Sequence, residues 1–305
     1  MEIIFLLAEL IPCLLIGYLL GRFKKDLSLT ISRPLMNYGI PVSLMGILLK
    51  SGIEFPLIQS AALALVAIGI LMTLLNCLPG IKNLIPNRSL QLGSAFGNTG
   101  YFGIPVSLAL LPNHALIYSI GFDLGATLVI WSIGPILLTD PSKVLSSNRY
   151  WQNFIKAIFR SPAVKGLIGA LIVHSSPWNE QLTALLWIPS RVVIVLALVI
   201  VGMRLSWLRK ANLSRIKIQI TSIKNALIMK LVGLPVIMLI ISSAIRLPNV
   251  MREALVLQSA APTAISVLLI SQAASRDEEE ATSLVVLSTI IALISIPAWL
   301  MILRL

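Results

Sequence analysis

Apolar stretches separated by short polar segments run along the whole chain. Charged residues, prolines and glycines divide them into ten runs, which are Ile3–Gly21, Ile31–Leu49, Pro56–Leu78, Ser89–Leu111, Ala115–Leu138, Pro162–His174, Leu182–Leu205, Ile223–Ile245, Val250–Gln272 and Ala281–Ile302. A helix needs about 20 mostly apolar residues to cross a bilayer, and all the runs except the sixth come near that length. The pattern predicts an all-α integral membrane protein with ten transmembrane helices.

Composition agrees with this class of protein. Of the 305 residues, 57% are hydrophobic and only 12% are charged, whereas soluble domains carry about a quarter charged residues. The net charge of +12 would suggest a nucleic-acid partner in a soluble protein. In a membrane protein it has a simpler source, because Lys and Arg gather in cytoplasmic loops. We therefore expect this protein to lie in a lipid bilayer and not to bind nucleic acid.

The positions of the basic residues also predict the orientation of the chain. With the N-terminus outside, all 24 Lys and Arg residues fall in inner loops or at inner helix ends except Lys50, Arg191, Arg246, Arg252 and Arg304. This asymmetry favours ten spans with both termini outside. The short loops are typical of a multi-pass protein of a bacterial inner (cell) membrane.

The longest polar stretch lies in the middle of the chain. Residues 1–138 hold five runs, 139–161 form a cytoplasmic linker, and 162–305 hold the other five runs of a single membrane domain. Because an odd number of spans inverts the second half, similar halves would be inverted five-helix repeats. Apolar residues at helical spacing in the linker fit either an interfacial helix or the water-facing start of the sixth span; they are Trp151, Phe154, Ile155, Ile158 and Phe159.

The fourth run contains the segment Gly97-Asn98-Thr99-Gly100-Tyr101-Phe102-Gly103-Ile104-Pro105. Gly costs about 1 kcal/mol and Pro about 3 kcal/mol in a helix interior, so this segment should unwind. Unwound backbone at membrane depth must be buried in protein or line a watery cavity. Its free N–H groups at the start of a half-helix attract anions. We predict that Asn98, Thr99, Gly100 and Pro105 bind a small organic anion.

A matching interruption, Gln258-Ser259-Ala260-Ala261-Pro262-Thr263, lies in the ninth run. Pro262 follows Pro105 by about half the chain. Two interrupted spans at matching positions of two halves are the sequence pattern of a transporter site. Gln258, Ser259 and Pro262 are therefore predicted to complete the site. The alternative is a pair of proline kinks that only shape helix packing.

These residues resemble a known family. Gly97–Pro105 with the following Val-Ser-Leu is similar to the fourth-helix signature of the auxin efflux carrier family, which occurs in plants and bacteria. Asn37-Tyr38-Gly39-Ile40-Pro41, Gly202-Met203, Gln258–Thr263 and Leu287-Ser288-Thr289 agree with the family in register. The resemblance covers nearly the whole chain.

The resemblance implies the fold of the bile-acid symporters, with ten helices in two inverted five-helix repeats. In that fold the broken fourth and ninth helices cross at the substrate site, and one bundle moves against a scaffold. It also implies a carboxylate substrate and a place for Ile40 at the site. Plant auxin carriers have a second asparagine near the start of the sixth helix, where this chain has Ala163, which argues against auxin itself.

Three ionisable residues lie within predicted spans, where such groups are functional candidates. Asp123 is near the middle of the fifth run, and a carboxyl that changes protonation there would couple transport to protons. It could equally cap a neighbouring broken helix. We interpret Glu9 as facing a cavity or the interface, and Lys230 as snorkelling to the inner surface.

The sequence thus predicts a secondary active transporter of small organic anions, working by elevator-type alternating access with H⁺ or Na⁺ as coupling ion. A sodium-coupled symporter of the bile-acid type, an anion receptor and a membrane enzyme are the alternatives. The chain shows no phosphate loop or HExxH motif, and His114 and His174 are too separated for a metal site, so we expect no enzyme, cofactor or metal. Cys13 and Cys77 are expected to be free thiols. Related folds are monomers or homodimers.

Overall fold

The computed structural model describes residues 2–23, 34–51, 55–138, 152, 155, 159, 162–208 and 223–305. The helices and helical turns in this part of the chain are α1 (Glu2–Phe23), η1 (Leu35–Gly39), α3 (Ile40–Ser51), α4 (Phe55–Cys77), α5 (Pro79–Leu84), α6 (Arg88–Ala95), η2 (Thr99–Gly103), α7 (Ile104–Leu110), η3 (Asn113–Ala115), α8 (Leu116–Leu138), α11 (Pro162–His174), α12 (Asn179–Leu208), η4 (Met229–Gly233), α14 (Leu234–Ala244), α15 (Asn249–Ser259), α16 (Ile265–Ala273) and α17 (Glu278–Leu303).

Four helical stretches support the prediction of a membrane protein. Among the described residues, the stretches Phe55–Cys77, Leu116–Leu138, Ile223–Ala244 and Glu278–Leu303 are long and apolar enough to cross a bilayer. Large apolar side chains on their outer faces, such as Ile240 and Ile294, are exposed, as expected of residues that face lipid. The chain is therefore an all-helical membrane protein in the part that the structure describes.

Some helices begin earlier than their apolar runs. The runs predicted to start at Leu182 and Ala281 belong to helices that start at Asn179 and Glu278. The extra residues include Glu180 and the acidic first turn Glu278–Glu280, and negative charge stabilises a helix N-terminus. An apolar criterion leaves such polar turns out. The predicted sixth span coincides with α11, whereas most of the linker 139–161 lies outside the described residues.

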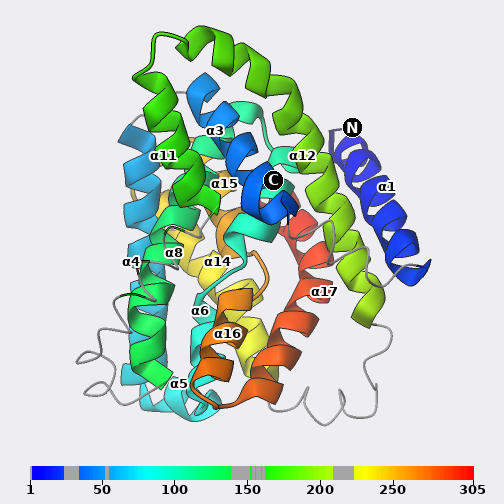
Figure 1. The fold of residues 1–305 in the computed structure, drawn as a ribbon. Coiled ribbons are helices and arrows are strands. Elements are labelled where there is room, and N and C mark those ends of the chain that lie inside the picture. Colours follow the sequence, from blue (N-terminus) through cyan, green and yellow to red (C-terminus); the bar gives the residue numbers. More distant parts are fainter. Residues whose placement is uncertain are drawn as a thin grey trace.

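The helices form two packed groups. In Figure 1, α1 lies along α12, and α3 packs against both α11 and α12. The second group is built on α4 and α8, which lie side by side, with α6, α14, α15, α16 and α17 packed around them. Buried apolar side chains from α3, α4, α7, α8 and α11 join the two groups; they include Leu44, Leu57, Ile104, Ile120 and Ala170.

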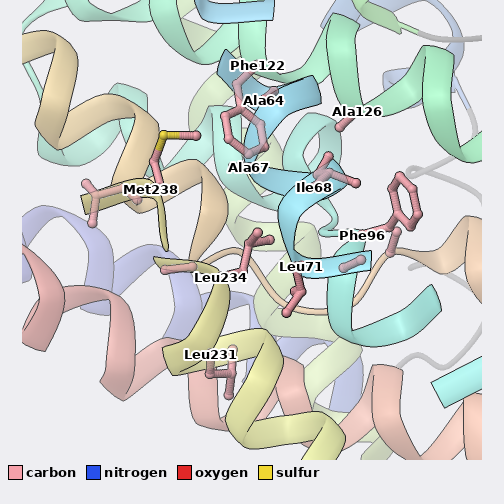
Figure 2. Packing of buried hydrophobic residues seen from close by; sticks show 14 of the residues in the cluster. Ala64, Ala67, Ile68, Leu71, Phe96, Phe122, Ala126, Leu231, Leu234 and Met238 are labelled. Carbon is pink, nitrogen blue, oxygen red and sulfur yellow. The ribbon is translucent and has the colours of Figure 1, made fainter. Parts of the chain in front are cut away.

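The core of the second group is continuous and apolar. Figure 2 shows Ala64, Ile68 and Leu71 of α4 among buried side chains such as Phe122 of α8 and Leu234 of α14. The buried face of α4 has small residues at Ser60, Ala64 and Ala67, which let neighbouring helices approach closely. Lipid tails are as apolar as leucine, so the hydrophobic effect does not drive these side chains from lipid into the protein. Tight van der Waals packing stabilises them there instead.

Two glycines of α8 allow its contact with α4. A Cβ atom at Gly125 would lie 2.5 Å from the Ala61 carbonyl oxygen, and one at Gly121 would overlap the Leu57 carbonyl. Both carbonyl groups belong to the α4 backbone, so they cannot relieve the overlap by a rotamer change as a side chain could. The spacing of four residues is the small-residue pattern of close helix pairs in membranes.

We expect Gly125→Ala to lower the unfolding temperature of purified protein by about 3–8 °C, because overpacking costs about 1–3 kcal/mol. Gly69→Ala on α4 is the matched control, since a Cβ there meets nothing within 4 Å. The control should be neutral or slightly stabilising. Equal unfolding temperatures for the two variants, measured in detergent by intrinsic fluorescence, would contradict this packing.

Candidate substrate site at the crossing of two interrupted helices

The interruption predicted in the fourth run is present. Helix α6 ends at Ala95, Phe96 has extended backbone angles (φ −107°, ψ 121°), and helical structure resumes at Thr99 as the π-turn η2. Pro105 directly follows the π-turn inside the helical stretch Thr99–Leu110 and is buried. The interruption thus lies at Phe96–Asn98, between α6 and this second half-helix.

The ninth run is interrupted in the same way. Helix α15 ends at Ser259 and α16 begins at Ile265, with Pro262 in the connecting stretch. The residues from Ala254 to Ala264 are all buried. Irregular backbone in this position agrees with the rule that unwound segments at membrane depth are enclosed by protein.

The two interruptions cross and bond to each other. Gly97 and Thr263 form an isolated antiparallel bridge. The Asn98 N–H donates to the Pro262 carbonyl at 2.6 Å, and the Ala264 N–H donates to the Phe96 carbonyl at 3.0 Å. Segments far apart in the sequence therefore satisfy the backbone groups that each lost by unwinding.

Asn98 lies at the centre of the crossing. Its carbonyl accepts hydrogen bonds from the N–H groups of Phe102 (3.1 Å) and Gly103 (3.0 Å), which holds the π-turn. Its side chain is half-buried and does not cap that turn. The amide carries both donors and an acceptor, and its predicted contact with a ligand stays a prediction.

Asp123 of α8 lies against the start of η2. The Thr99 hydroxyl donates to Asp123 Oδ1 at 2.5 Å, and a Cβ at Gly100 would be 3.0 Å from the same oxygen. Among the described residues, Asp123 is the buried acidic side chain. The structure thus joins Thr99 and Gly100 to the carboxyl predicted as a coupling group.

Gln258 connects the second interruption to α7. Its Nε2 donates to the Ser107 hydroxyl at 3.1 Å, while its buried Oε1 has no hydrogen-bond partner. A Cβ at Gly103 would overlap that oxygen, so the glycine makes room for the amide. If the amide turns over, the hydroxyl can donate to Oε1 and an N–H becomes free for a ligand. Ser107 was not among the predicted site residues.

The interpretation of Lys230 as a snorkelling residue is wrong. Its side chain is fully buried, and its Nζ donates to the Ser259 carbonyl at 2.6 Å. A Cβ at Gly97 would be 3.2 Å from the same Nζ. The lysine therefore reaches the crossing. A lysine at this depth in a span can extend either toward the inner surface or toward the crossing, and the sequence pattern does not distinguish these two directions.

Two further hydroxyls that sequence reasoning missed hold the second interruption in place. The Thr263 hydroxyl donates to the Gly93 carbonyl, and its backbone N–H donates to the Ser288 hydroxyl, both at 2.9 Å. Both residues lie within segments that resemble the family, which was the signal available for them.

The structure thus brings most of the predicted site residues together. The Asn98 N–H bonds to the Pro262 carbonyl, and Thr99 and Gly100 follow Asn98 in the chain, where they lie against Asp123. Ser259 accepts the hydrogen bond of Lys230, whose ammonium lies near Gly97, and Gln258 bonds to Ser107 of the helix that contains Pro105. Ile40 begins α3, which packs against α11 and α12, and its side chain lies outside what the structure describes, as does that of Glu9.

Comparison with known proteins assigns the family. The family model described as membrane transport protein matches residues 3–300, which is nearly the whole chain. No curated protein matches the sequence. A match of this extent covers both interruptions and all the residues of the candidate site. The chain belongs to the membrane transport protein family, also known as the auxin efflux carrier family, and is a membrane transporter.

Proposed function

We propose that this transporter is a secondary carrier of small organic anions, with carboxylates as the substrate class. The observation that carries the proposal is the crossing itself, where two interrupted helices bond to each other beside Asn98. Carriers with broken helices bind their substrates at such midplane crossings.

The charge around the crossing supports an anionic substrate. Lys230 is buried, and its ammonium lies close to Gly97, the residue before Asn98. The helix Thr99–Leu110 begins directly after Asn98, and a helix N-terminus carries partial positive charge. A carboxylate held by the Asn98 amide would therefore meet two sources of positive potential.

The two packed groups, each with helices from both predicted inverted repeats, support an elevator-type movement of one group against the other. The helices α1, α3, α11 and α12 form the scaffold of this proposal, and the group around α4 and α8 carries the crossing. The side chains joining the groups are apolar, for example Leu48 and Ile117. Among the described residues, the ion pair joins Arg304 and Glu253 of the second group, so a sliding movement of the groups would not have to break it.

Asp123 is the candidate for proton coupling. Its carboxyl contacts Thr99 of the first interruption, so a change in its protonation would act directly on the crossing. Coupling to sodium is the second candidate, because the buried Gln258 Oε1 lacks a donor and an amide oxygen is a ligand for Na⁺. Dependence of uptake on Na⁺ at fixed pH separates the two.

Counterflow in proteoliposomes tests the proposed function. Vesicles loaded with a mono- or dicarboxylate should take up the labelled compound, whereas vesicles loaded with the corresponding neutral amide should not, because the crossing favours negative charge. Protein-free vesicles and protein reconstituted after heat denaturation are the controls. Equal exchange of amide and acid, or exchange of none of a broad carboxylate panel by folded protein, contradicts the anion assignment.

A further inference from the structure

The buried lysine at the crossing has an unusual set of partners. Lys230 is fully buried, and its ammonium bonds to the carbonyl of Ser259. Among the described residues, no carboxylate lies within ion-pair distance of Lys230. The ion pair in that part of the chain joins Arg304 and Glu253, away from the lysine. A buried charge normally needs an opposite charge or several polar partners. Here backbone oxygen serves as the partner.

The carbonyl that it contacts lies at the end of a half-helix. Ser259 is the last residue of α15, an eleven-residue helix whose C-terminal carbonyls have no partners farther along the helix. Such carbonyls carry partial negative charge, and the C-terminal ends of broken helices hold monovalent cations in coupled carriers. The Lys230 ammonium therefore stands where a free cation would be bound.

The same ammonium lies against both interrupted segments. A Cβ at Gly97 would be 3.2 Å from Lys230 Nζ and 3.3 Å from the Ala261 carbonyl oxygen, so a larger residue there would press on both groups. The lysine belongs to η4, a π-turn within the span Ile223–Ala244, and π-turns are frequent at functional positions of helices. The ammonium thus bonds to the end of α15 and lies close to Gly97 of the first interruption.

We propose that Lys230 is a tethered cation. Its ammonium permanently occupies the monovalent cation site at the C-terminal end of α15, so the carrier needs no Na⁺ at that position. This inference deepens the proposed function and rests on it, because it assigns the cation side of a carrier site. It predicts that removing the lysine side chain creates a dependence on free cations that the natural protein lacks.

Lys230→Ala empties the space that the ammonium occupies. Its unfolding temperature in detergent should rise by about 3–5 °C when Na⁺ or methylammonium replaces the large cation N-methylglucamine at equal ionic strength. The natural protein should show no shift. In proteoliposomes the variant should exchange carboxylate at least about tenfold more slowly without these cations, and their addition should restore most of the rate.

Two matched variants separate a cation site from a structural role. Lys230→Met fills the space with an apolar chain of similar length, so neither cation should stabilise it or restore exchange. Lys224→Ala removes an exposed lysine of the same span and should behave like the natural protein. If Lys230→Ala does not fold, Lys230→Ser takes its place, because it also leaves room and adds a hydroxyl ligand.

Either of two results would overturn the inference. One is a folded Lys230→Ala or Lys230→Ser protein whose stability is the same in all the cations. The other is a Lys230→Met protein that Na⁺ stabilises as much as it stabilises Lys230→Ala, which would place the bound cation away from the space of the ammonium. Because the stability measurement needs no substrate, it decides the cation site even if no carboxylate is exchanged, in which case the anion assignment alone fails.

Discussion

Replacing Asp123 with asparagine should abolish uptake driven by a proton gradient. The amide has the size of the carboxyl and can still accept the Thr99 hydroxyl, but it cannot bind and release a proton. Accumulation in proteoliposomes with an acidic outer solution should therefore fall by at least about tenfold, to the level without a gradient. Counterflow, which needs no net driving force, should stay within about threefold of the natural rate.

Thr99→Val is the matched control for Asp123→Asn. It removes the hydroxyl that donates to Asp123 Oδ1 but leaves the carboxyl in place. The valine variant should still accumulate substrate in response to the gradient, at a lower rate than the natural protein because Thr99 is itself a predicted substrate contact. Full gradient-driven accumulation by Asp123→Asn would show that this carboxyl has a structural role and that another group couples the carrier.

Gly103→Ala should reduce carboxylate exchange by about 10- to 100-fold, because displacement of a binding group by about 1 Å can cost a factor near 10². The new methyl group would overlap Gln258 Oε1, and Gln258 is fully buried and bonded to Ser107. The amide must therefore move, which displaces a side chain predicted to bind the substrate.

Gly80→Ala is the control for this substitution, since a Cβ there meets no atom within 4 Å. Initial rates of counterflow for both variants, normalised to the amount of folded protein in the vesicles, provide the comparison. Exchange by Gly103→Ala at the rate of Gly80→Ala would mean that the contact between the two interruptions does not shape the substrate site.

The two interruptions could be predicted because their cause is local. Glycines and a proline within an apolar run disfavour a continuous helix whatever lies around them. The short span Pro162–His174 could be placed for the same reason, since polar residues and a proline bound it. The predicted membrane class followed from composition, which needs no knowledge of contacts.

The contacts between the two halves could not be predicted in the same way. A hydropathy pattern gives the depth of Lys230 in its span but not the direction of its side chain, which depends on the neighbouring helix ends. Likewise the bond between Gln258 and Ser107 joins residues 151 positions apart in the sequence. The spacing of Gly121 and Gly125 indicates a close helix contact, but it does not tell that α4 is the partner.

The most direct test of a carboxylate site at the crossing is counterflow by the natural protein and Asn98→Ala, reconstituted side by side. Gly69→Ala serves as a folded control away from the crossing. We predict exchange of one carboxylate class by the natural protein and the control, and its loss in Asn98→Ala. Undiminished exchange by Asn98→Ala would contradict the account and leave the glycine-rich interruption as a feature of helix packing.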